Sequence, residues 1–88
     1  MGEIEVLLLT QPDCRHCEDA KRVLHTLARE FPLAVRVLDV GTDEGRELAA
    51  RGGILFPPGV FVNGEPFSYG RPSERRLRKA LGRTLDRA

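Results

Sequence analysis

The stretch Pro12-Asp13-Cys14-Arg15-His16-Cys17 lies where the chain changes from one pattern to another. The continuous apolar run Val6-Leu7-Leu8-Leu9 before it predicts a strand over residues 3–10 that is buried on both faces. Apolar side chains at helical spacing after it predict a helix over residues 14–30. Both cysteines are therefore expected where a buried strand leads into an amphipathic helix.

The downstream sequence predicts further strands and helices. Asn63-Gly64 is a strong hairpin signal, so antiparallel strands are expected on either side of it. The predicted elements are a strand at 33–40, a helix at 42–51, strands at 59–62 and 65–69, and a last helix opened by Gly70-Arg71-Pro72-Ser73. The resulting order, β-α-β-α-β-β-α, predicts an α/β fold with a four-stranded mixed sheet flanked by helices. At 88 residues the chain is expected to form a single domain over residues 1–88.

Composition excludes several classes of protein. The net charge of +1 is too small to indicate a nucleic-acid partner. No apolar run approaches the roughly 18–20 residues needed to span a membrane. The start, Met1-Gly2-Glu3-Ile4-Glu5, carries two acids where a secretory signal would carry basic residues. We therefore expect a cytoplasmic, monomeric protein without a membrane or nucleic-acid partner.

The two cysteines are better explained by chemistry than by stability, because a disulfide across so short a loop constrains the unfolded chain little. Residues three apart on a helix lie about 4.5 Å apart along its axis, nearly on one face. Cys14 is expected beside the unpaired N–H groups that begin the helix, which stabilise a thiolate. Cys14 is therefore the predicted nucleophile, and Cys17, one turn deeper, the predicted resolving thiol. Positive charge on Arg15 and His16 is expected to lower the pKa of the Cys14 thiol further, against the opposing carboxylate of Asp13.

These residues resemble the thioredoxin superfamily, most closely its glutaredoxin-like branch. Three landmarks carry the resemblance over nearly the whole chain: Pro12 to Cys17, the run Pro58-Gly59-Val60-Phe61-Val62-Asn63-Gly64, and Gly70-Arg71-Pro72-Ser73. The resemblance implies a thioredoxin-like fold and a cis bond between Pro57 and Pro58, with Pro58 facing the reactive cysteine.

The same resemblance implies a substrate-binding site and a set of partners. Substrate is expected to bind at Pro57, Pro58 and Gly59, and at Gly70 and Arg71 before the last helix. The implied activity is thiol–disulfide exchange with protein or glutathione disulfides. It requires no bound cofactor or metal, with glutathione as the candidate co-substrate and an unidentified reductase as electron donor.

Two other functions use the same sequence features. A Cys-x-x-Cys loop before a helix also binds soft metal ions, and two chains can share an iron–sulfur cluster through such loops. A redox-silent interaction module would keep the fold without the chemistry. Both alternatives stay open from the sequence.

Overall fold

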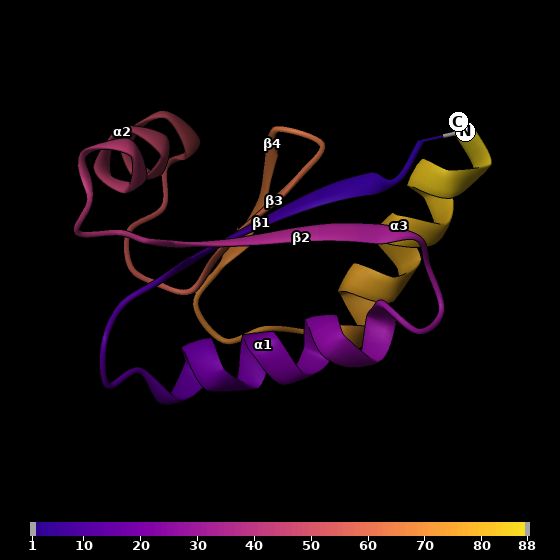
Figure 1. Ribbon diagram of the computed structural model, residues 1–88, viewed down its shortest axis with the longest axis horizontal. Coiled ribbons are helices and arrows are strands. Elements are labelled where there is room, and N and C mark those ends of the chain that lie inside the picture. Colours follow the sequence, from indigo (N-terminus) through magenta and orange to yellow (C-terminus); the bar gives the residue numbers. More distant parts are fainter. Residues whose placement is uncertain (1, 88) are drawn as a thin grey trace.

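A computed structural model describes residues 2–87 as seven elements in the order β-α-β-α-β-β-α (Figure 1). The strands form one sheet in the order β2-β1-β3-β4. β2 is parallel to β1, β3 is antiparallel to β1, and β4 is antiparallel to β3. The predicted four-stranded mixed sheet and its thioredoxin-like topology are confirmed. The bounds are β1 Ile4–Thr10, α1 Arg15–Leu27, β2 Leu33–Asp39, α2 Asp43–Gly52, β3 Gly59–Val62, β4 Glu65–Tyr69 and α3 Glu74–Arg87.

Successive side chains of β1 point to opposite faces of the sheet, so the core has two layers. Ile4, Val6 and Leu8 are buried on the face covered by α1 and α3. Leu9 is buried on the other face, against Phe61 of β3 and the apolar side of α2. Figure 1 shows α2 on one side of the sheet and α1 with α3 on the other. The continuous apolar run of β1 is explained by this central position, since a strand with helices on both faces needs apolar side chains on both.

The first helix ends earlier than the predicted range, residues 14–30. α1 spans Arg15–Leu27, and the chain then tightens through bonds from Arg29 N–H to Thr26 O (3.1 Å) and from Glu30 N–H to Leu27 O (2.9 Å). These three-residue spacings form a closer turn than an α-helix does. The turn leads to Pro32, whose carbonyl accepts the N–H of Ile4 at the start of β1 (2.8 Å). The predicted helix is therefore three residues too long, because the chain tightens after Leu27 before it returns to the sheet at Pro32.

None of the helices between residues 2 and 87 combines the length and the apolar character that crossing a bilayer requires.

Candidate active site

A left-handed residue turns the chain from β1 into α1. β1 ends at Thr10, and Asp13 adopts a positive φ of 53° before Cys14 returns to an extended conformation. Aspartate tolerates this region better than most residues because its short side chain can hydrogen-bond locally. The sequence predicted a turn here but not its left-handed conformation. The turn places Cys14 at the N-cap of α1, ahead of the first helical residue.

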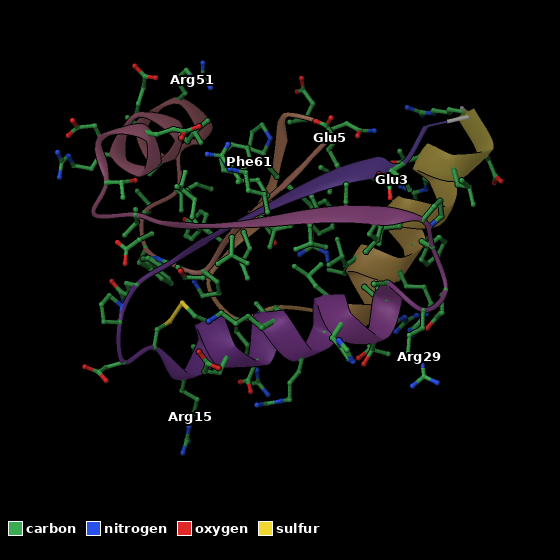
Figure 2. All side chains as sticks on the ribbon, in the orientation of Figure 1. Glu3, Glu5, Arg15, Arg29, Arg51 and Phe61 are labelled. Carbon is green, nitrogen blue, oxygen red and sulfur yellow. A yellow bond between two sulfur atoms is a disulfide. The ribbon has the colours of Figure 1, made fainter. Side chains whose placement is uncertain are left out.

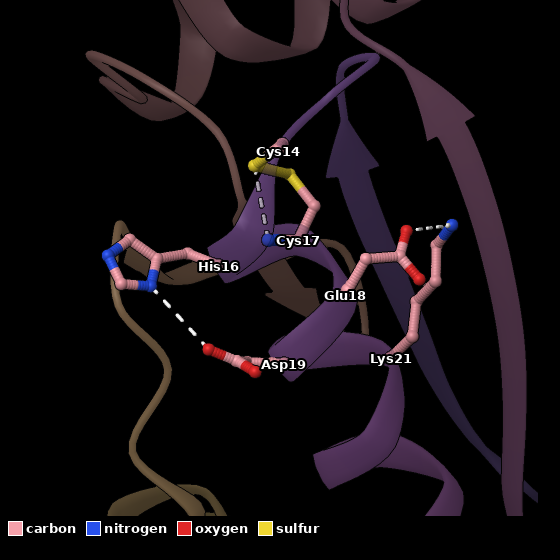
Figure 3. Close-up of a disulfide and its surroundings, with 6 residues drawn as sticks. All are labelled: Cys14, His16, Cys17, Glu18, Asp19 and Lys21. Carbon is pink, nitrogen blue, oxygen red and sulfur yellow. Dashed lines mark hydrogen bonds and ion pairs between the residues drawn. A yellow bond between two sulfur atoms is a disulfide. The ribbon is translucent and has the colours of Figure 1, made fainter.

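Cys14 and Cys17 form a disulfide with Cα atoms 5.2 Å apart (Figure 3). The N–H of Cys17 donates to Cys14 Sγ (3.1 Å), so the sulfur takes the place that a serine or aspartate oxygen usually fills at a helix N-cap. Cys14 is partly exposed, whereas Cys17 is 1% exposed within the core side of α1. One sulfur is therefore open to a substrate, and the other lies behind it.

Arg15 and His16 follow Cys14 on the first turn, and both are exposed. The Arg15 side chain points away from the sheet into solvent (Figure 2). The His16 ring is turned toward Asp19, with Nδ1 3.7 Å from Asp19 Oδ2 (Figure 3). Asp19 also pairs with Arg22. The structure thus turns Arg15 away from the sheet and gives His16 a carboxylate neighbour, which the sequence reasoning missed although the spacing of three residues was visible.

The two prolines before β3 lie at the same edge of the sheet as Cys14. The Pro57–Pro58 peptide bond is cis, and Pro58 is fully buried. Gly59 pairs with Leu9 near the end of β1, which places the preceding prolines beside the turn that leads to Cys14. Four of the predicted substrate-binding residues are therefore brought to this edge, since Gly70 N–H donates to Pro58 O (2.8 Å).

Arg71 is exposed on the segment between β4 and α3. It lines a polar groove of about 340 Å³ together with Asp19 and Arg22 of α1. This groove places Arg71 across from Asp19 and Arg22 of α1, and neither cysteine lines it.

Among residues 2–87, no group of three or more His, Cys, Asp and Glu side chains converges in a way that could bind a metal ion.

Comparison with known proteins gives consistent matches. The family model described as "Thioredoxin domain" matches residues 2–82. The thioredoxin of Methanocaldococcus jannaschii is 34% identical over 85 residues, covering 97% of this chain and 100% of that protein. A probable thioredoxin of Archaeoglobus fulgidus is 34% identical over 74 residues, covering 84% of this chain and 81% of that protein.

The solved structures that this chain resembles also include thioredoxins. A thioredoxin variant from Halobacterium salinarum superposes with a TM-score of 0.69 at 26% identity, covering 93% of this chain and 74% of that one. Thioredoxin from Trypanosoma brucei brucei shares the fold at 20% identity, with a TM-score of 0.71 over 96% of this chain and 76% of that one. The superfamily resemblance is confirmed, and these relatives are thioredoxins rather than glutaredoxins. The chain belongs to the thioredoxin family and is a thiol–disulfide oxidoreductase.

Proposed function

We propose that the chain exchanges its Cys14–Cys17 pair with disulfides of proteins, with Cys14 as nucleophile and Cys17 as resolving thiol. The observation that carries the proposal is the asymmetry of the pair: Cys14 is partly exposed at a helix N-cap, while Cys17 is 1% exposed one turn later. A thiolate at the N-cap is stabilised by the free N–H groups and the positive end of the helix dipole. The buried Cys17 thiol is poorly accessible to a substrate, but it lies within disulfide-bonding distance of Cys14.

The exchange balances in two steps. The Cys14 thiolate attacks one sulfur of the substrate disulfide, that S–S bond breaks, and the departing substrate sulfur takes up a proton. Cys17 then loses its proton and attacks Cys14 Sγ, which breaks the mixed disulfide and releases the second substrate thiol. The substrate gains two electrons and two protons, and the chain is left with the Cys14–Cys17 disulfide. A thiol reductant or a reductase must return the pair to the dithiol.

Several surrounding residues are proposed to support this exchange. Arg15 and His16 supply positive charge to the first turn of α1, where it favours the thiolate over the thiol. Pro57, Pro58, Gly59 and Gly70 form the neighbouring wall at which the substrate chain would lie. Arg71 would meet substrate groups beyond that wall.

Glutathione is the weaker candidate for the co-substrate. The named relatives are thioredoxins, and protein disulfides with a reductase as electron donor fit that family better. The proposed unit of activity is the single domain, since the family model spans residues 2–82.

Reduction of insulin disulfides by the full chain, with dithiothreitol as electron donor, tests the proposal. We expect the wild-type protein to accelerate insulin reduction, Cys14→Ser to fall to the uncatalysed rate, and Cys17→Ser to accumulate a mixed disulfide through Cys14. That adduct is identified by its mass and by its release with excess dithiothreitol.

Three results would contradict the proposal. They are a wild-type chain without activity on insulin, an adduct formed through Cys17 in Cys14→Ser, and absorbance above 300 nm with bound metal in protein purified without oxygen.

A further inference from the structure

The two edges of the sheet differ in how well they are protected against pairing with another strand. The strand order leaves β2 and β4 at the edges. β4 has only five residues, it contains Pro66, and its register with β3 is irregular between Val60 and Phe61, all of which discourage a further strand. β2 has seven residues and no proline, and its register with β1 is continuous from Leu33 to Asp39. Among residues 2–87, no strand pairs with the outer side of β2.

The outer side of β2 carries the backbone groups of alternate residues. The N–H of Ile4 donates to Pro32 O (2.8 Å) at one end of the β1–β2 pairing. At the other end, the N–H of Val40 donates to Thr10 O (2.8 Å). Successive residues of a strand turn their backbone groups to opposite sides, so the even-numbered residues of this segment face β1. The N–H and C=O groups of the odd-numbered residues from 33 to 39 therefore point to the open edge, where another strand can bind them.

The side chains at this edge are apolar on the face that carries α1. Leu33, Val35 and Val37 are in register with the residues of β1 that α1 and α3 cover. Val35 is 42% exposed and Val37 48%. Both line a groove of about 290 Å³ whose opposite wall includes Leu24 and Ala28 of α1. A strand added at this edge would therefore place its side chains on apolar surface.

The charges near this edge already have partners within the chain. Charged side chains are a common protection of a strand edge. Arg36, in the middle of β2, donates to both carboxylate oxygens of Glu44 (3.0 and 2.8 Å). Lys21, which also lines the groove, donates to Glu18 (3.2 Å). The positive charge of Arg36 is therefore balanced inside the chain, which weakens its repulsion of a second strand.

We infer that β2 pairs with β2 of a second copy of this chain, antiparallel about a two-fold axis at Val35. This register sets Val35 opposite Val35 of the second copy, and Leu33 opposite Val37 of the second copy. All of these residues have outward backbone groups, so each opposed pair can exchange two hydrogen bonds. An axis at Arg36 would set two guanidinium groups opposite each other, and an axis at Val37 would set Asp39 opposite Val35. The resulting dimer replaces the monomer that was expected from the sequence.

Sedimentation equilibrium of the oxidised protein tests the dimer. In this form Cys14 and Cys17 are bonded to each other, so no disulfide can link two copies. One pair of strands makes a small interface, so a dissociation constant of about 100 µM is expected. A wild-type protein that stays monomeric up to about 1 mM would overturn the proposal.

Charge substitutions at the proposed axis test the register. Val35→Lys or Val35→Glu alone sets like charges opposite each other, and each is expected to weaken the dimer about tenfold or more. An equimolar mixture of the two variants brings opposite charges together, and it is expected to form a mixed dimer about tenfold more tightly than either variant alone. A mixture that associates no better than the separate variants would overturn the proposed register.

Val37→Lys and Val37→Glu are matched controls on the same strand. The proposed register sets Val37 opposite Leu33, so mixing these two variants is expected to bring no recovery. Recovery in this mixture would place the axis at Val37 and overturn the register about Val35.

Leu85→Lys is the matched control on another element, because Leu85 is also exposed (40%) but lies on α3. It is expected to keep the wild-type dissociation constant. Equal weakening by Leu85→Lys and Val35→Lys would show association through exposed apolar side chains in general and would overturn the β2 interface. Thermal unfolding of each variant checks its fold, and the wild-type measurement stands without any variant.

Discussion

The two ends of the sheet differ in how far their side chains are buried and paired. At the redox end, around Cys14, Phe56 and Tyr69, apolar side chains remain exposed. At the far end, where α1 stops and β2 begins, Leu27 is fully buried and Arg78 of α3 makes a bidentate bond to Glu30 (2.8 and 2.7 Å). Figures 1 and 2 show α3 beside the end of α1, and the disulfide at the opposite end of that helix.

This difference concerns how much each end contributes to stability. The far end buries Leu27 and pairs Arg78 with Glu30, so these residues contribute to the free energy of folding. The redox end leaves the apolar side chains of Phe56 and Tyr69 partly in water, so they contribute less to the free energy of folding. Substitution of a buried side chain at the far end should therefore change the free energy of unfolding without changing the redox properties of the cysteine pair.

The largest effect is expected from the core at the far end. Leu27→Ala removes a fully buried side chain from the cluster shared by β1, α1 and α3, and is expected to lower the free energy of unfolding by about 2–5 kcal/mol. Urea unfolding of the oxidised protein measures the loss, with the exposed Leu85→Ala as control. The reduction potential of the cysteine pair should stay the same. A potential shifted by about 30 mV or more would show that the two ends are not independent.

A smaller loss is expected from Gly45, which lies near the redox end at the start of α2. A Cβ at this position would overlap the backbone carbonyl of Asp39 at the end of β2, and backbone yields less readily than a side chain. Gly45→Ala is therefore expected to cost about 1–3 kcal/mol of unfolding free energy. Gly82→Ala in α3 is the matched control, because nothing lies within 4 Å of its Cβ position and the change should stabilise the helix by up to about 1 kcal/mol.

Equal stabilisation by Gly45→Ala and Gly82→Ala would contradict this packing.

The smallest effect is expected from the ion pair at the far end, and it depends on pH. The hydrogen bond from Arg78 holds the pKa of the Glu30 carboxyl below its usual value of 4.5. Because the folded-state pKa lies below that of the unfolded chain, the pair stabilises the fold above about pH 4.5 and loses this contribution as the pH falls through the lowered value. Arg78→Met should therefore be less stable than the wild-type protein at pH 7, with the gap closing toward pH 3.

Urea unfolding of both proteins across this range measures the gap. Both side chains of the pair are 41% exposed, so solvent screening keeps the effect small. If the difference in unfolding free energy between the two proteins stays constant down to pH 3, it comes from the packing of the Arg78 side chain rather than from its charge.

Much of the fold follows from local patterns. The apolar run of β1, the helical spacing of Ala20, Leu24 and Leu27, and the Asn63-Gly64 turn predicted the element order and the main core residues. The expected helix end at residue 30 was wrong by three residues, because the chain tightens after Leu27 into hydrogen bonds between residues three apart. Cys14 and Cys17 were visible in the sequence because their chemistry depends on a spacing of three residues.

The surroundings of the cysteines were less predictable. The contact of Phe56 with Tyr69 and the pairing of Glu30 with Arg78 join residues far apart in the sequence. Such contacts depend on how elements pack, and a residue pattern within one element carries little information about them.

By itself, the sequence determined that a strand, a turn and an amphipathic helix would bring two thiols to one helix terminus, because periodicity and spacing act over a few residues. Only the tertiary structure decided which apolar side chains stay in water and which charges find partners. Those outcomes depend on burial, and burial is a property of the packed chain rather than of any local segment.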